Sequence, residues 1–118
     1  MHNVPTRIGP EVRALYANPS CSLEQIKTAQ ALTDAVGFTY VTVDEDELDR
    51  VTAVAGSGPG YAFEIARCWI DAAIKLGFSP QTAKELVLNT IGGSLELAMT
   101  SDQSPEALRN PATRKKGT

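Results

Sequence analysis

The stretch VTAVAGSGPGYAFEIA, residues 51–66, decides how this chain is interpreted. Its three glycines, Gly56, Gly58 and Gly60, follow a short apolar run and precede a helical pattern. A strand, a glycine-rich turn and the start of a helix would together hold a pyrophosphate group through backbone N–H groups. The first question is therefore whether these residues form the phosphate-binding turn of a dinucleotide-binding domain.

The residues around the glycines do not fit such a turn. The dinucleotide fingerprint is G-x-G-x-x-G, and Tyr61 stands where the third glycine belongs. No acidic residue follows at the distance that would hold a ribose, and the lysine that ends a P-loop is missing. Upstream, Leu48, Val51 and Val54 recur at nearly helical spacing behind the acidic run 44–47. The sequence therefore favours a helix before the glycines.

The segment after the glycines predicts a helix that is apolar over most of its circumference. Its charged residues form one narrow stripe, three or four positions apart: Glu64, Arg67, Asp71 and Lys75. A helix of this kind is normally surrounded by protein. A chain of 118 residues is too short to surround it easily by itself. We therefore expect a second subunit to cover it, with the core of a plain helical bundle as the alternative.

Small residues along this helix would let a second backbone come close, and Pro59 would bend the helix or mark a break in it. A further glycine pair, Gly92–Gly93, lies in the next predicted helix, 81–99, where it is costly unless something packs against it. The pattern predicts interlocked helices from two subunits. The residues that we expect at the dimer interface are Gly56, Gly58, Pro59, Ala62, Ala66 and Trp69.

The first 44 residues read as β-α-β. We expect a strand over 12–17 and a helix that begins with a capping box at Ser22. Apolar residues recur at helical spacing as far as Val36, Gly37 is expected to end the helix, and 38–43 is rich in β-branched and aromatic residues. This unit lacks a glycine-rich turn between strand and helix.

The composition changes near Asp44, and everything beyond it reads as helix. Ser79-Pro80 and Ser104-Pro105 each place a proline at the first helical position. The predicted fold class is mainly α, a helical dimerisation domain preceded by a short β-α-β remnant of a Rossmann-like domain. We place the domains at 1–44 and 45–118, and expect the second to be truncated at its C-terminus.

Composition and charge exclude several classes of function. The net charge of −3 does not favour nucleic acid, and no apolar run is long enough to span a membrane. The N-terminus has no signal-peptide pattern. With one histidine and no CxxC pair, a metal site is not expected. Cys21 and Cys68 are expected to be free thiols of a cytoplasmic protein.

Three stretches in order resemble the pyrroline-5-carboxylate reductase family: AGSGPGYAF at 55–63, AAIKLGFSP at 72–80 and SPEALRNPAT at 104–113. The start of the chain is similar to the family's M-x-N-x-P stretch, and YANPS, VGF and VTVDEDELDRVTA follow in family order. The glycine-rich stretch resembles the family motif S-G-S-G-P-A-Y, which has alanine where this chain has Gly60. The resemblance covers nearly the whole chain.

The resemblance implies a reductase that converts pyrroline-5-carboxylate to proline with NADPH or NADH. It implies a Rossmann domain followed by a helical domain that intertwines with that of a second subunit. Asn3 and Pro5 match a stretch near the nicotinamide pocket. The loop that holds the substrate carboxylate corresponds to 112–118, which assigns substrate binding to Thr113, Gly117 and Thr118.

The carboxylate loop departs from the family pattern. Arg114 stands where serine is usual, and Lys115 and Lys116 replace Pro-Gly. These cations would strengthen carboxylate binding, change the substrate, or form a solvated basic tail. No residue is assigned as a catalytic acid or base, because the cofactor carries hydride chemistry.

The interpretation that results is a fragment of a pyrroline-5-carboxylate reductase, either cut from a longer protein or naturally short. It is expected to form a homodimer, to bind no dinucleotide tightly and to be inactive alone. The alternative is a non-catalytic dimerisation module that pairs with itself or with a full-length reductase. A third possibility is an independent small-molecule binder that uses the basic tail.

Overall fold

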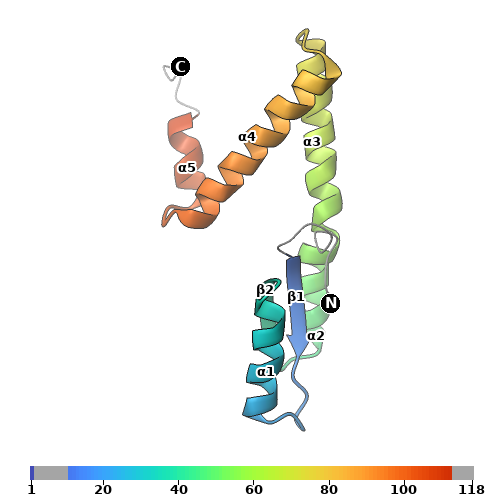
Figure 1. The fold of residues 1–118 in the computed structure, drawn as a ribbon, viewed down its shortest axis with the longest axis vertical. Coiled ribbons are helices and arrows are strands. Elements are labelled where there is room, and N and C mark those ends of the chain that lie inside the picture. The colour runs from blue at the N-terminus through green and yellow to red at the C-terminus, as the bar shows by residue number, and fades with distance from the viewer. Residues whose placement is uncertain (2–10, 113–118) are drawn as a thin grey trace. The chain divides into compact units, whose positions relative to one another are not determined.

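The computed structural model describes residue 1 and residues 11–112, and the chain divides into two compact units, Met1–Glu64 and Ile65–Thr118. Helices predominate over strands in the described chain, which confirms the predicted fold class (Figure 1). The elements in chain order are β1 (Glu11–Tyr16), α1 (Leu23–Asp34), β2 (Gly37–Thr42), α2 (Asp46–Val51), the π-helical turn η2 (Thr52–Gly56), α3 (Gly58–Lys75), α4 (Pro80–Thr100) and α5 (Pro105–Ala112).

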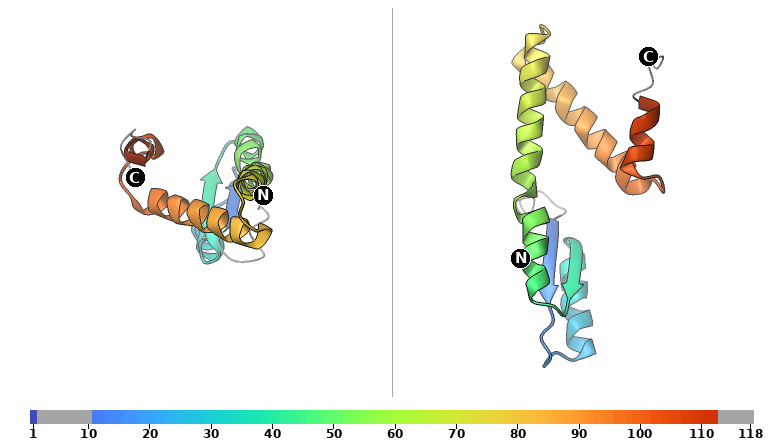
Figure 2. Two further views of the ribbon diagram at one scale, coloured as in Figure 1. Left: turned by 90° about the horizontal axis from the view of Figure 1, so that it is seen from above. Right: turned by 180° about the vertical axis from the view of Figure 1, so that it is seen from behind.

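The first unit is built on a β-α-β motif, as the sequence predicts. β1 and β2 pair in parallel, with Glu11 opposite Gly37 and Tyr16 opposite Thr42, and α1 is the crossover between them. α1 and α2 cover opposite faces of the two strands (Figure 2). Both strands begin and end one residue earlier than the predicted ranges.

The start of α1 follows the predicted capping box. The Ser22 side chain accepts a hydrogen bond from the Gln25 backbone N–H, and the Gln25 side chain accepts one from the Ser22 backbone N–H. The end of α1 differs from the prediction, because the helix stops at Asp34 and Gly37 is the first residue of β2. Gly37 is there because a Cβ at that position would lie 2.2 Å from the Glu11 carbonyl oxygen.

Helical structure is nearly continuous from Asp46 to Lys75, with a break at Ser57. α2 runs into a π-helical turn, and α3 begins directly after the break. Pro59 therefore lies in the first turn of α3, where its missing N–H costs nothing. The prediction of helix ahead of the glycines is confirmed, and no strand leads into Gly56.

The second unit has its core at the junction of α3 and α4. Ala73 packs with Ala83 and Val87 of α4, and two partly buried isoleucines, Ile70 and Ile91, complete the cluster. Small side chains at the junction let the two helices approach each other closely. In Figures 1 and 2, α4 leaves the end of α3 at a steep angle.

The turns in the second unit follow the predicted helix-cap chemistry. Gly77 has φ of +105°, a conformation that only glycine adopts without strain, and it stops α3. The Ser79 side chain accepts the backbone N–H of Thr82, with Pro80 as the first residue of α4. Ser104 accepts the backbone N–H of Ala107 in the same way at the start of α5.

Candidate functional site

The predicted dimer-interface residues lie along the helical run that crosses the middle of the chain. Gly58, Ala62, Ala66 and Trp69 are spaced four, four and three residues apart, which puts them on one side of α3. The charged stripe lies on the opposite side, where Arg67 donates a hydrogen bond to Asp71 at 2.7 Å. α3 therefore has one solvated stripe and an apolar remainder.

The small residues differ in how closely this chain packs on them. A Cβ added at Gly58 or Gly60 would meet nothing within 4 Å, whereas one at Gly56 would lie 3.0 Å from the Thr52 methyl group. Ala66 is buried within the chain, but Trp69 keeps 47% of its surface exposed. The interface role of these residues stays a prediction.

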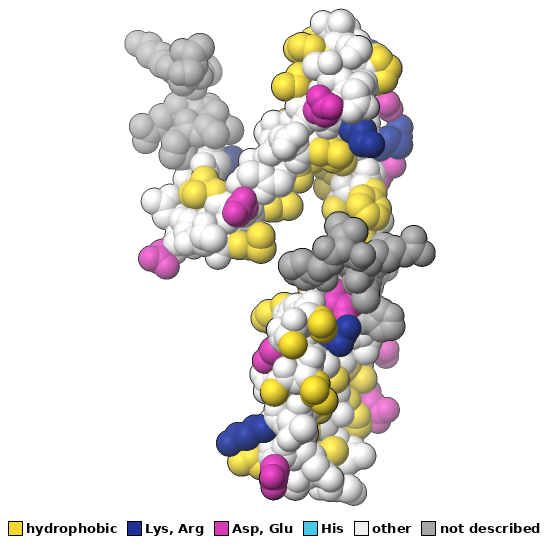
Figure 3. Space-filling view, viewed as in Figure 1, with side chains coloured by type: hydrophobic (Ala, Val, Ile, Leu, Met, Phe, Trp, Pro, Cys, Tyr) yellow, Lys and Arg dark blue, Asp and Glu magenta, His cyan; other side chains and the backbone are white. Residues whose placement is uncertain are grey.

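Most large apolar side chains of α3 and α4 are exposed. The buried apolar residues of the two helices are three alanines and one valine: Ala66, Ala73, Ala83 and Val87. Figure 3 shows apolar side chains gathered over the visible parts of both helices. The large residues that remain exposed on them are Tyr61, Phe63, Ile65, Trp69, Ile74, Leu86, Leu88, Leu95, Leu97 and Met99.

A polar cluster fastens the start of α2 to β2. The Glu47 carboxylate accepts hydrogen bonds from the hydroxyl groups of Thr42 and of Tyr40, the latter at 3.1 Å. Arg50 forms ion pairs with Asp44 at 3.0 Å and with Glu47 at 3.4 Å. This cluster is not predicted from the sequence, although the acidic run 44–47 marks its position.

The cluster shifts the pKa of its members. The hydrogen bond from Thr42 is the main cause that lowers the pKa of Glu47, and Tyr40 and Arg50 act in the same direction. The hydrogen bond to Glu47 raises the pKa of Tyr40. The hydrogen bond to Asp44 raises the pKa of Arg50. Because the side chains bond to one another, the cluster is a clamp between strand and helix.

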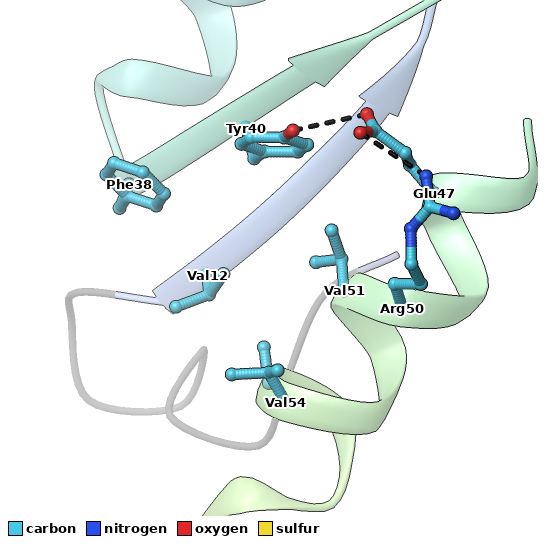
Figure 4. A pocket seen from close by; sticks show the side chains of 8 residues that line it. Val12, Phe38, Tyr40, Glu47, Arg50, Val51 and Val54 are labelled. Carbon is cyan, nitrogen blue, oxygen red and sulfur yellow. Dashed lines mark hydrogen bonds and ion pairs between the residues drawn. The ribbon is translucent and has the colours of Figure 1, made fainter. Parts of the chain in front are cut away.

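Beside this clamp lies a pocket of about 450 Å³. Figure 4 shows Phe38 and Tyr40 of β2 facing Val51 and Val54, with Val12 of β1 between them. Glu47 and Arg50 close one end, and the rest of the lining is apolar. A second pocket of about 340 Å³ lies on the other face of the strands, beneath α1.

Several predicted site residues fall outside the described part of the chain. These are the cofactor residues Asn3 and Pro5 and the substrate residues Thr113, Gly117 and Thr118. Within the described part, no group of three His, Cys, Asp or Glu side chains could hold a metal ion, and no helix is long and apolar enough to cross a membrane. Cys21 and Cys68 are exposed and are not joined in a disulfide.

Residues 45–118 match the family described as pyrroline-5-carboxylate reductase dimerisation. The chain belongs to the pyrroline-5-carboxylate reductase family. It is 40% identical over 118 residues to the pyrroline-5-carboxylate reductase of Pseudomonas aeruginosa, with all of this chain and 43% of that protein aligned. It is 35% identical to pyrroline-5-carboxylate reductase 2 of Bacillus subtilis, of which it covers 42%.

Solved structures of reductases from this family have the same fold. The pyrroline-5-carboxylate reductase of Coxiella burnetii superimposes with a TM-score of 0.93 at 32% identity, over 100% of this chain and 44% of that one. The Plasmodium falciparum pyrroline carboxylate reductase with NADP bound gives a TM-score of 0.87 at 30% identity, over 100% and 48%. The chain thus spans less than half the length of these relatives.

Proposed function

We propose that this chain is part of an NAD(P)H-dependent reductase that converts pyrroline-5-carboxylate to proline, and that it supplies the region where two subunits join. The family match over 45–118 carries the proposal. The alignment with the Pseudomonas relative uses all of this chain but 43% of that protein. The reaction is therefore assigned to the complete reductase, and the 118-residue chain alone is expected to be inactive.

The proposed assembly is a homodimer with intertwined helices. The exposed side chains of α3 and α4 support it, because each large apolar residue that becomes fully buried contributes roughly 1.5–3 kcal/mol. The open space beside Gly58 supports it also, since a second backbone fits where no Cβ projects.

We further propose roles in the complete enzyme for the terminal residues. Asn3 and Pro5 lie by the nicotinamide of NADPH or NADH, and Thr113, Gly117 and Thr118 bind the substrate carboxylate. The cofactor supplies the hydride, so these residues act by positioning the imine against it. The support is the match of the chain to the family motifs in sequence order.

A second candidate function is a dimerisation module without catalysis, which pairs with itself or with a full-length reductase. The described residues favour it in one respect. Their single glycine-rich stretch, 56–60, follows helix instead of a strand, so it offers no turn for a pyrophosphate.

An activity assay with two proteins distinguishes these functions. The 118-residue chain is mixed with NADPH and pyrroline-5-carboxylate, and no oxidation of NADPH is expected. A chimera then receives the remaining N-terminal and C-terminal parts of the Pseudomonas relative, and activity is expected to appear. An active short chain would contradict the proposal, and an inactive but folded, dimeric chimera would favour the dimerisation module.

A further inference from the structure

We draw no further inference here: the strongest candidate, the apolar pocket of about 450 Å³ between β2 and α2, carries none, because nothing in the described part of the chain shows what covers it.

Discussion

At the residue scale, the glycines of this chain are of two kinds: some leave no room for a side chain, and others do. Gly37 lies against the Glu11 backbone, so no side chain fits. Gly60 has open space where a Cβ would be, and the family motif has alanine there. The same residue type therefore has opposite tolerance to substitution, and only the structure distinguishes the two cases.

Replacing Gly37 by alanine is expected to destabilise the β-α-β unit by about 1–3 kcal/mol, because the strands must move apart to admit the methyl group. Gly60→Ala is the control. It is expected to leave stability unchanged or to raise it by up to about 1 kcal/mol through helix propensity. Urea unfolding followed by circular dichroism measures both, and equal loss of stability in the two variants would contradict the close approach at Gly37.

Glu47 gives the unit a predictable dependence on pH. Hydrogen bonds, chiefly the one from Thr42, lower the pKa of Glu47 in the folded state below its ordinary value of 4.5. The contribution of the ionised Glu47 to stability is therefore complete above pH 4.5. That contribution is lost as the pH falls from 4.5 through the lower folded pKa. Glu47→Gln is expected to remove this part of the decrease.

Melting temperatures measured between about pH 3 and 6 test the clamp. Glu45→Gln is the control, since the Glu45 side chain does not cap α2. If the melting temperatures of Glu47→Gln, Glu45→Gln and the wild type all fell in parallel as the pH is lowered over this range, the clamp would be refuted.

At the element scale, local chemistry predicted the starts of helices better than their ends. The Ser22, Ser79 and Ser104 caps all form as the sequence indicates, because each needs only a hydroxyl group and an N–H three residues on. The predicted end of α1 was two residues too late. Gly37 is needed because its backbone lies against that of Glu11, which is distant in sequence, and not because it ends the helix.

The same distinction explains what sequence reasoning missed. The π-helical turn at 52–56 holds one more residue per hydrogen-bonded turn than an α-helix does. No residue type specifies such a turn, so it could not be predicted from the sequence. The Tyr40–Glu47–Arg50 clamp and the pocket beside it arise from packing β2 against α2. Periodicity did predict the apolar character of α3, because this is a property of one helix.

Ser22→Ala is expected to cost about 1 kcal/mol of local stability in α1, because the Gln25 backbone N–H loses the Ser22 hydroxyl group as its hydrogen-bond acceptor. Hydrogen exchange of the first turn of α1 measures it. Ser20→Ala is the matched control, since the Ser20 hydroxyl caps no helix. Similar exchange rates in the two variants would show that the capping box does not hold α1.

Trp69→Asp tests α3 as the proposed interface element. A buried unpaired carboxylate is expected to raise the dimer dissociation constant at least about thirtyfold, as for an interface hot spot. Lys75→Glu, on the charged stripe, is expected to change it little. Sedimentation velocity compares the two, and a Trp69→Asp variant that dimerises like Lys75→Glu would move the interface away from this side of α3.

At the scale of the whole molecule, the chain belongs to a reductase family. It spans less than half the length of the relatives that it matches. Its described part contains a β-α-β motif and helices, with large apolar side chains left on the surface. Motif order identified the family from the sequence. The residues assigned to cofactor and substrate lie outside the described part, so those assignments remain predictions.

The order of helices and strands also predicts that the chain binds NADPH and NADH weakly or not at all. Because helix precedes Gly56, no glycine-rich strand-to-helix turn is offered by the described residues. Calorimetric titration with NADPH and with NADH is expected to show no binding tighter than about 1 mM, equivalent to about −4 kcal/mol. Micromolar affinity would mean that another part of the chain holds the phosphates.

In the proposed assembly, two copies of this chain join through helices whose apolar side chains are exposed in a single copy. Sedimentation equilibrium of the wild-type chain at micromolar concentration tests it most directly, with circular dichroism to show that the protein is folded. A species of twice the chain mass that dissociates only on dilution or unfolding is expected. A well-folded monomer at the same concentration would contradict it.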